Sequence, residues 1–161
     1  SFEYFLEKNF LNKVNVKKEN QHFLREENLE SYEQEIKKSE GIDLCILGIG
    51  KNGHIAFNEP GSQFKTRTRR IRLREETRRA NKKFFKSLKE VPKEALTIGV
   101  RTILEARKIL LVAFGKEKAR AVDASLNYKP RAHWPASALQ LHRNAKFVVD
   151  KNAGLKLRAL C

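Results

Sequence analysis

The sequence contains no methionine, only two cysteines and one tryptophan, and no apolar run near the ~20 residues that a membrane-spanning helix needs. Cys45 lies inside an apolar segment and Cys161 is the last residue, so we expect reduced thiols rather than a disulfide framework. The chain also lacks a charged-then-apolar signal peptide, which favours a cytoplasmic protein. Cysteines and histidines form no cluster with zinc spacing, so no metal site is predicted.

The sequence has no methionine, and so does not begin with one. The first residues, Ser1-Phe2-Glu3-Tyr4, already follow a helical pattern. We therefore expect the chain to be an excerpt of a longer one.

Acidic residues are scarce relative to basic ones. The chain has 34 lysines and arginines against 19 aspartates and glutamates, a formal net charge of +15. Such an excess favours acidic partners, namely nucleic acid, anionic membrane surfaces or phosphorylated small molecules. We attribute the larger share of this excess positive charge to an ordinary solvated surface. With 40% apolar and 33% charged residues, the composition is that of a folded domain rather than a disordered chain.

Apolar spacing divides the chain into alternating helices and strands. Predicted helices cover residues 1–13, 28–41, 75–88, 92–106, 116–126 and 136–142. Predicted strands cover residues 21–25, 42–47, 66–73, 108–115 and 145–150. Strand–helix–strand alternation predicts right-handed crossovers and a parallel sheet, so the fold class is α/β, with residues 1–161 in a single domain.

The segment from Gly48 to Pro60, Gly-Ile-Gly-Lys-Asn-Gly-His-Ile-Ala-Phe-Asn-Glu-Pro, follows a wholly apolar strand. In open α/β folds, ligands bind at the carboxyl edge of the sheet, where such a loop lies. His54 can exchange protons at neutral pH. The nearby carboxylate of Glu59 is expected to orient the imidazole and raise its pKa. The segment therefore predicts a catalytic loop.

A dinucleotide site is a minor alternative reading of the same loop. Gly48, Gly50 and Gly53 match the G-x-G-x-x-G pattern, which requires a helix to begin at once and an acidic residue about 20 positions later. The residues from Asn58 to Gly61 interrupt any such helix. The later positions carry arginines, which suit the 2′-phosphate of NADP: Arg67, Arg69, Arg70 and Arg72.

The loop and the segments after it resemble the glucosamine-6-phosphate deaminases, also called glucosamine-6-phosphate isomerases. The resemblance covers nearly the whole chain in the expected order. It continues through Ser62, Thr66-Arg67-Thr68-Arg69, Val91–Val100, Gly115–Ala119 and Pro135–His142. The related 6-phosphogluconolactonases share a Gly-x-Gly-x-Asp-Gly-His core, but they depart at Phe57-Asn58-Glu59-Pro60. That stretch favours the deaminases.

The resemblance implies a three-layer, Rossmann-like parallel sheet with helices on both faces, whose early strands lie before Ser1. It also implies the conversion of glucosamine 6-phosphate and water into fructose 6-phosphate and ammonia, without a cofactor. His54 would be the acid/base for ring opening, oriented by Glu59 and Asn52. Asn52 stands where the better-known pattern has aspartate, so its role is to orient the ring.

Further residues are implied by position in the same way. Lys118 and Lys83 would bind the substrate phosphate beside the three glycines, Gly48, Gly50 and Gly53. Ser62 and Arg69 match an allosteric site of some relatives, although Ile71 replaces one of its cations.

The residue that moves the C2 proton in this family has no counterpart in the chain. We therefore expect the 161 residues alone to lack deaminase activity and to expose apolar sheet surface. Two other functions remain open: a catalytically silent sugar-phosphate binder, and a basic nucleic-acid-binding protein that uses Arg67–Arg79 and Lys82–Lys86. We favour a phosphorylated amino sugar as partner, with neither nucleic acid nor membrane. Homo-oligomerisation is left open.

Overall fold

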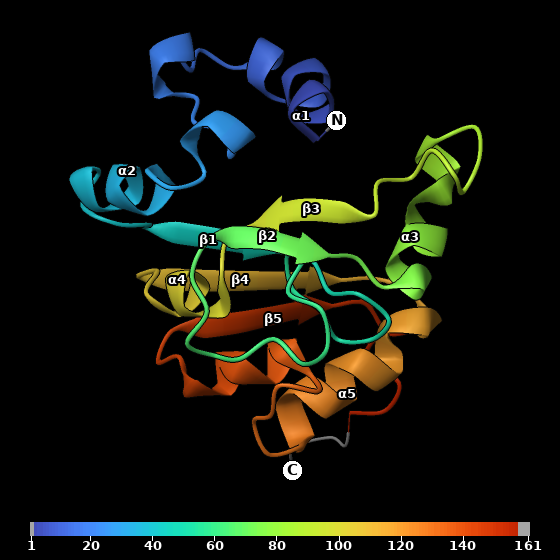
Figure 1. Ribbon diagram of the computed structural model, residues 1–161. Helices are drawn as coiled ribbons and strands as arrows, with labels where there is room; N and C mark the ends of the chain where they lie inside the picture. Colours follow the sequence, from blue (N-terminus) through green and yellow to red (C-terminus); the bar gives the residue numbers. More distant parts are fainter. Residues whose placement is uncertain (1, 158–161) are drawn as a thin grey trace.

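The computed structural model describes residues 2–157, and its central element is a parallel three-stranded sheet (Figure 1). The strands are β1 (Leu44–Leu47), β4 (Lys108–Ala113) and β5 (Ala145–Val149), in the order β1-β4-β5. Cys45 is paired with Ile109, and Leu111 with Phe147. Helices flank the sheet, so the α/β class predicted from the sequence is confirmed.

One face of this sheet carries the hydrophobic core. Alternate side chains of β1 and β4, such as Leu47, Ile109 and Leu111, are buried. They share a core with α4 (Val100–Leu104), α5 (Ala119–Asn127) and the 3-10 helix η6 (Pro135–Leu141). Small alanines on α5 and η6 allow these elements to approach the sheet closely. Because successive side chains of a strand point to opposite faces, the period-two burial follows from the strand itself.

The other face is apolar and largely uncovered in this chain. Leu44, Ile46 and Val148 are 50%, 65% and 50% exposed. Strands of parallel sheets are normally buried on both faces. The exposed apolar sheet surface expected from the sequence is therefore present.

A second, antiparallel sheet pairs β2 (Arg69–Arg72) with β3 (Glu94–Thr97), and α3 (Glu75–Asn81) and η4 (Lys82–Phe84) lie between them in the chain. This corrects two predictions. The sequence predicted only a parallel sheet, and it predicted a helix over residues 92–106, of which only Val100–Leu104 in α4 is α-helical. The stretch Glu94–Thr97 instead pairs its backbone with β2, because tertiary pairing overrides a weak helical preference.

The amino-terminal segment comprises α1 (Phe2–Asn9), η1 (Leu11–Lys13), η2 (Lys18–Asn20), η3 (Glu26–Asn28) and α2 (Tyr32–Lys38). In Figure 1 this blue segment and the orange α5 lie on opposite sides of the sheets. The strand predicted over residues 21–25 is wrong, since no strand occurs there. Asn28 does not cap α2 either. Its side chain closes a turn by accepting from Arg25 N–H at 2.7 Å and donating to Phe23 O at 2.9 Å.

Most remaining elements occur close to their predicted positions. The helix predicted over residues 75–88 ends at Asn81 in α3, and the helix over residues 116–126 is η5 (Lys116–Lys118) followed by α5. The short helix predicted over residues 136–142 is a 3-10 helix, η6. Within residues 2–157, no helix combines the length and the apolar character needed to cross a membrane. Cys161 lies outside the described residues.

Candidate functional site

The glycine-rich loop leaves the carboxyl end of β1, as the sequence predicted. Lys118 follows the carboxyl end of the neighbouring parallel strand β4, through Gly115, which adopts a φ of 91°. The Lys118 Nζ donates to the carbonyl oxygen of Ile49 at 2.7 Å. The loop and the lysine therefore meet at one edge of the sheet.

Two of the three glycines leave space that another side chain occupies. A Cβ on Gly50 would lie 2.3 Å from the imidazole of His54. A Cβ on Gly53 would lie 2.5 Å from the ring of Trp134, and the φ of Gly53 is 81°, which a side chain disfavours. A Cβ on Gly48, in contrast, would meet nothing within 4 Å. Gly50 thus admits the imidazole, and Gly53 admits the tryptophan against which the loop packs.

His54, Asn52 and Glu59 form one hydrogen-bonded chain. His54 Nδ1 lies 2.8 Å from Asn52 Oδ1, and the Asn52 Nδ2 donates to Glu59 Oε2 at 3.0 Å. Since a carboxylate only accepts, the amide must present its nitrogen to Glu59 and its oxygen to the ring. The proton of neutral His54 therefore sits on Nδ1, and the lone pair on Nε2. Asn52 Oδ1 also accepts from the His54 backbone N–H at 3.3 Å, which fixes the amide further.

Glu59 is only 4% exposed. Its Oε2 lies 3.7 Å from His54 Nδ1, and its Oε1 accepts from the backbone N–H of Arg74 at 3.2 Å. Arg74 also donates from its guanidinium to the carbonyl oxygen of Pro60 at 2.6 Å. The carboxylate is thus held between the loop and the chain that leads into α3.

Burial lowers the pKa of His54 below its ordinary value, and it outweighs the opposing attraction of Glu59. The positive charge of Lys118 adds to the lowering, whereas Glu76 acts against it. This corrects the sequence-based expectation of a raised pKa: Glu59 does favour the imidazolium, but removal of the ring from water matters more. Neutral His54 is therefore the form present at pH 7.

Cations surround the same edge. Burial lowers the pKa of Lys118, and the nearby charges of Lys51 and Lys83 lower it further, while Glu117 opposes them. Lys83 is exposed on η4, with its Nζ 5.0 Å from the centre of the Phe84 ring. The charge of Lys83 therefore acts on Lys118, and the binding of a phosphate by these two lysines stays a prediction. Lys51 was not named from the sequence.

Ser62 and Arg69 also meet. The Arg69 guanidinium donates to Ser62 Oγ at 3.1 Å and to Asn58 Oδ1 at 2.9 Å. Asn58 is fully buried and donates to the carbonyl oxygens of Ile55 and Ile98. Whether this cluster binds an effector stays a prediction.

The arginines between residues 67 and 79 are largely engaged within the chain. Arg67 pairs with Glu105, Arg70 with Glu26, and Arg79 with Glu75. Arg78 donates to the carbonyl oxygens of Leu88 and Val91. These contacts weaken the reading of this stretch as a track for nucleic-acid phosphates.

The structure also speaks against a dinucleotide site. Between Gly53 and the start of α3 at Glu75 there is no helix, so the glycine loop does not lead directly into a helix, as the dinucleotide pattern requires. Among residues 2–157, no group of three or more histidine, cysteine, aspartate and glutamate side chains is placed to hold a metal ion. Burial raises the pKa of Cys45 to about 11, which makes its thiol a poor nucleophile.

Sequence reasoning missed three residues that support the loop: Asn58, Arg74 and Trp134. Asn58 lies inside the motif, and its position beside Glu59 was a usable signal. Arg74 contacts Glu59 through its backbone, which no side-chain pattern reveals. Trp134 is the only tryptophan in the chain, but only the fold places it against Gly53.

Comparison with known proteins gives concordant results. The family described as glucosamine-6-phosphate isomerases/6-phosphogluconolactonase matches residues 1–149. A glucosamine-6-phosphate deaminase of Thermoanaerobacter sp. (strain X514) is 46% identical over 159 residues, covering 95% of this chain and 63% of the relative. Glucosamine-6-phosphate deaminase 1 of Giardia intestinalis is 45% identical over 168 residues, covering 100% of this chain and 63% of the relative. The chain thus spans somewhat less than two thirds of these relatives.

Solved structures agree with this assignment. A monomeric glucosamine-6-phosphate deaminase matches with a TM-score of 0.90 and 39% identity, over 98% of this chain and 68% of that one. The 6-phosphogluconolactonase of Trypanosoma brucei matches with a TM-score of 0.60 and 23% identity, over 91% and 57% of the two chains, which shows a shared fold. The chain belongs to the family of glucosamine-6-phosphate isomerases and 6-phosphogluconolactonases.

Proposed function

We propose that the chain supplies the ring-opening part of a glucosamine-6-phosphate deaminase site, in a protein that converts glucosamine 6-phosphate and water into fructose 6-phosphate and ammonia. The observation that carries the proposal is the hydrogen-bonded chain His54–Asn52–Glu59, which holds neutral His54 with its proton on Nδ1 and a lone pair on Nε2. The deaminases at 45–46% identity support the choice of reaction.

Ring opening follows from this arrangement. The Nε2 lone pair accepts the proton of the anomeric hydroxyl, and the imidazolium that forms is stabilised by Asn52 and by the negative charge of Glu59. The same proton then moves from Nε2 to the ring oxygen as the bond between that oxygen and C1 breaks. The products are the open-chain aldehyde and a neutral His54, ready for a further cycle.

The cations at the sheet edge fit the substrate's phosphate. Lys118 and Lys83 lie close enough to repel each other, and a phosphate dianion between them would relieve that repulsion. Lys118 also stands at the beginning of α5, where the helix dipole favours an anion. Gly48 leaves the loop backbone open to a ligand. No cofactor enters this scheme.

The later step, proton transfer from C2 to C1, needs a base that the resemblance does not find in the chain. We therefore expect the 161-residue chain alone to bind the substrate without releasing fructose 6-phosphate. A protein that binds without turnover even when whole would instead be the silent relative. Association into oligomers stays a prediction.

The test is the turnover of the whole protein, followed as fructose 6-phosphate and ammonia. His54→Ala should lower kcat/KM by about 10²- to 10⁴-fold, which is the usual contribution of general acid–base catalysis. His22→Gln is the control, because it removes an exposed histidine of the amino-terminal segment. Unchanged turnover in His54→Ala would refute the assignment.

A further inference from the structure

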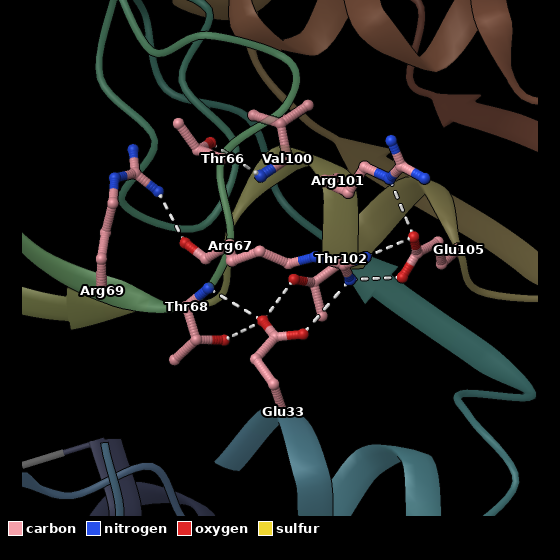
Figure 2. Close-up of polar contacts among 9 residues, drawn as sticks. All are labelled: Glu33, Thr66, Arg67, Thr68, Arg69, Val100, Arg101, Thr102 and Glu105. Carbon is pink, nitrogen blue, oxygen red and sulfur yellow. Dashed lines mark hydrogen bonds and ion pairs between the residues drawn. The ribbon is translucent and has the colours of Figure 1, made fainter. Parts of the chain in front are cut away.

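Glu33, on α2, holds a set of hydrogen bonds that the proposed chemistry does not use. Its Oε1 accepts from the Thr68 backbone N–H at 2.8 Å, from the Thr68 hydroxyl at 2.6 Å and from the Thr102 hydroxyl at 2.5 Å. Its Oε2 lies 3.3 Å from the guanidinium of Arg67. Figure 2 shows the carboxylate pointing from α2 into the space between these three residues. One side chain thus joins α2 to the approach of β2 and to α4.

These polar contacts join α2 to the approach of β2 and to α4 where the helix itself has little buried surface. No residue of the helix is buried, although Ile36 is partly covered. A cleft of about 360 Å³ lies beside the helix and is lined by Glu33, Ile36, Ile42 and Glu105 among others. Tyr32 and Ile36 are only half-buried, so the contacts of the Glu33 carboxylate contribute to fixing the position of α2.

The segment 66–69 is clamped from several directions. The Arg101 N–H donates to Thr66 O at 3.0 Å. Thr66 approaches α4 so closely that a Cβ on Gly99 would lie 2.0 Å from its carbonyl oxygen. Arg67 pairs with Glu105, which also accepts from the guanidinium of Arg101 at 2.8 Å. Glu33 contacts the same segment from α2, through Thr68 and Arg67.

The same segment leads to the candidate site. Arg69 donates to Arg67 O at 3.3 Å and to Asn58 Oδ1 at 2.9 Å. Asn58 is fully buried and directly precedes Glu59. A displacement of the segment would therefore move the guanidinium that donates to the Asn58 side chain, next to Glu59 in the chain.

Glu33 is ionised at neutral pH. Its burial opposes the charge, but hydrogen bonds from Thr102 and Thr68, with the charge of Arg67, hold the pKa of its carboxyl below the ordinary value. The carboxylate can therefore accept all these hydrogen bonds at once.

We propose that Glu33 is a positioning residue of the His54 site: it clamps the segment 66–69 so that Arg69 holds Asn58, and with it Glu59, in place beside Asn52 and His54. The proposal rests on the function proposed above only in treating His54 as catalytic. The positional claim itself stands on the network of contacts.

The test is an NMR titration of the His54 imidazole in the 161-residue chain, wild type and Glu33→Gln. Glutamine keeps the shape but removes the charge, and it offers a single acceptor oxygen to the donors. The charged groups acting on His54 are Glu59, Lys118 and Glu76. If Glu59 shifts away, its favourable effect on the imidazolium weakens. The pKa of His54 should then fall by about half a unit, a fraction of the 1–3 units that such a neighbour contributes.

Glu35→Gln is the matched control. It makes the same change on the same helix, where the Glu35 carboxylate accepts from the Ser31 hydroxyl and lies 4.0 Å from His22. It should leave the titration of His54 unchanged. A folded Glu33→Gln chain whose His54 titrates as in wild type would overturn the proposal.

If Glu33→Gln does not fold, a second pair of variants tests the positioning role of Glu33. Thr102→Val removes one donor to Glu33, whereas Thr102→Ser keeps the hydroxyl. The valine variant should lower the pKa of His54 and the serine variant should not. Equal titrations in both would overturn the proposal. Because the titration requires no turnover, its result stands whether or not the protein processes glucosamine 6-phosphate.

Discussion

Asn52 sets the chemical state of His54, because an amide can donate to one neighbour and accept from another. It accepts from the imidazole at 2.8 Å and donates to Glu59 at 3.0 Å, so it keeps the ring and the carboxylate in one line without adding charge. Burial lowers the pKa of His54 more than the charge of Glu59 raises it, so the imidazole is neutral. A neutral ring is the form that accepts a proton from a sugar hydroxyl.

The first prediction concerns this amide. Asn52→Asp places a negative charge next to the imidazole and should raise the pKa of His54 by about 1 unit or more. Since His54 is proposed to act in its neutral form, the acid limb of the pH dependence of kcat/KM should move to higher pH. The wild-type limb should lie below about pH 6.5, because burial depresses the pKa. The measurement is an NMR titration together with the pH–rate profile.

Asn127→Asp, at the end of α5, is the control for the same change of charge. A titration of His54 that is identical in wild type and Asn52→Asp would contradict the contact between the amide and the ring.

At this scale, sequence reasoning was successful for residues that lie near one another in the chain. His54, Asn52 and Glu59 fall within one loop, so their proximity could be predicted. The pKa direction could not be, because burial depends on the surrounding fold. Glu33 was also missed, since it reaches Thr68 and Thr102 from a distant helix.

At the scale of elements, Gly99 determines how α4 meets the segment that leads into β2. A Cβ on Gly99 would lie 2.0 Å from the carbonyl oxygen of Thr66, so there is no space for a side chain. The sequence predicted a continuous helix here because Pro92 to Ala106 has helical spacing. It could not show that Glu94–Thr97 has a strand partner in β2, which is distant in the chain. In contrast, the strands at β1 and β4 were predictable, because short continuous apolar runs are typical of strands in a parallel sheet.

The second prediction tests this junction. Gly99→Ala should lower the free energy of unfolding by about 1–3 kcal/mol or more, because its methyl group meets backbone that must shift. Chemical denaturation followed by circular dichroism measures the change. Gly48→Ala is the control, since a Cβ there meets open space. Equal stability of the two variants would contradict the close packing of Thr66 on α4.

At the scale of the whole molecule, the two faces of the parallel sheet differ sharply. One is packed against α4, α5 and η6, and the other exposes Leu44, Ile46 and Val148. The basic residues also differ in their partners: several arginines pair with acidic side chains of the chain, whereas the charges of Lys51 and Lys83 act on Lys118 near the glycine loop. A bare apolar face of this kind favours self-association.

The third prediction concerns this face. Ile46→Thr keeps a β-branched side chain and should change the free energy of unfolding by no more than about 0.5 kcal/mol, as expected for an exposed site. It should also reduce association, measured by sedimentation equilibrium. Leu111→Ala on the buried face should instead cost about 2–5 kcal/mol. If the two variants were equally destabilised, the assignment of the two faces would be wrong.

The most direct test of the central claim, that His54 opens the sugar ring, is the exchange between the α and β anomers of glucosamine 6-phosphate. Exchange requires ring opening and closure but no proton transfer at C2, so the 161-residue chain suffices. Two-dimensional exchange NMR measures the rate with and without protein. We predict that the wild-type chain accelerates exchange and that His54→Ala does not. Equal acceleration by both, or none by wild type with the sugar phosphate bound, would contradict the account.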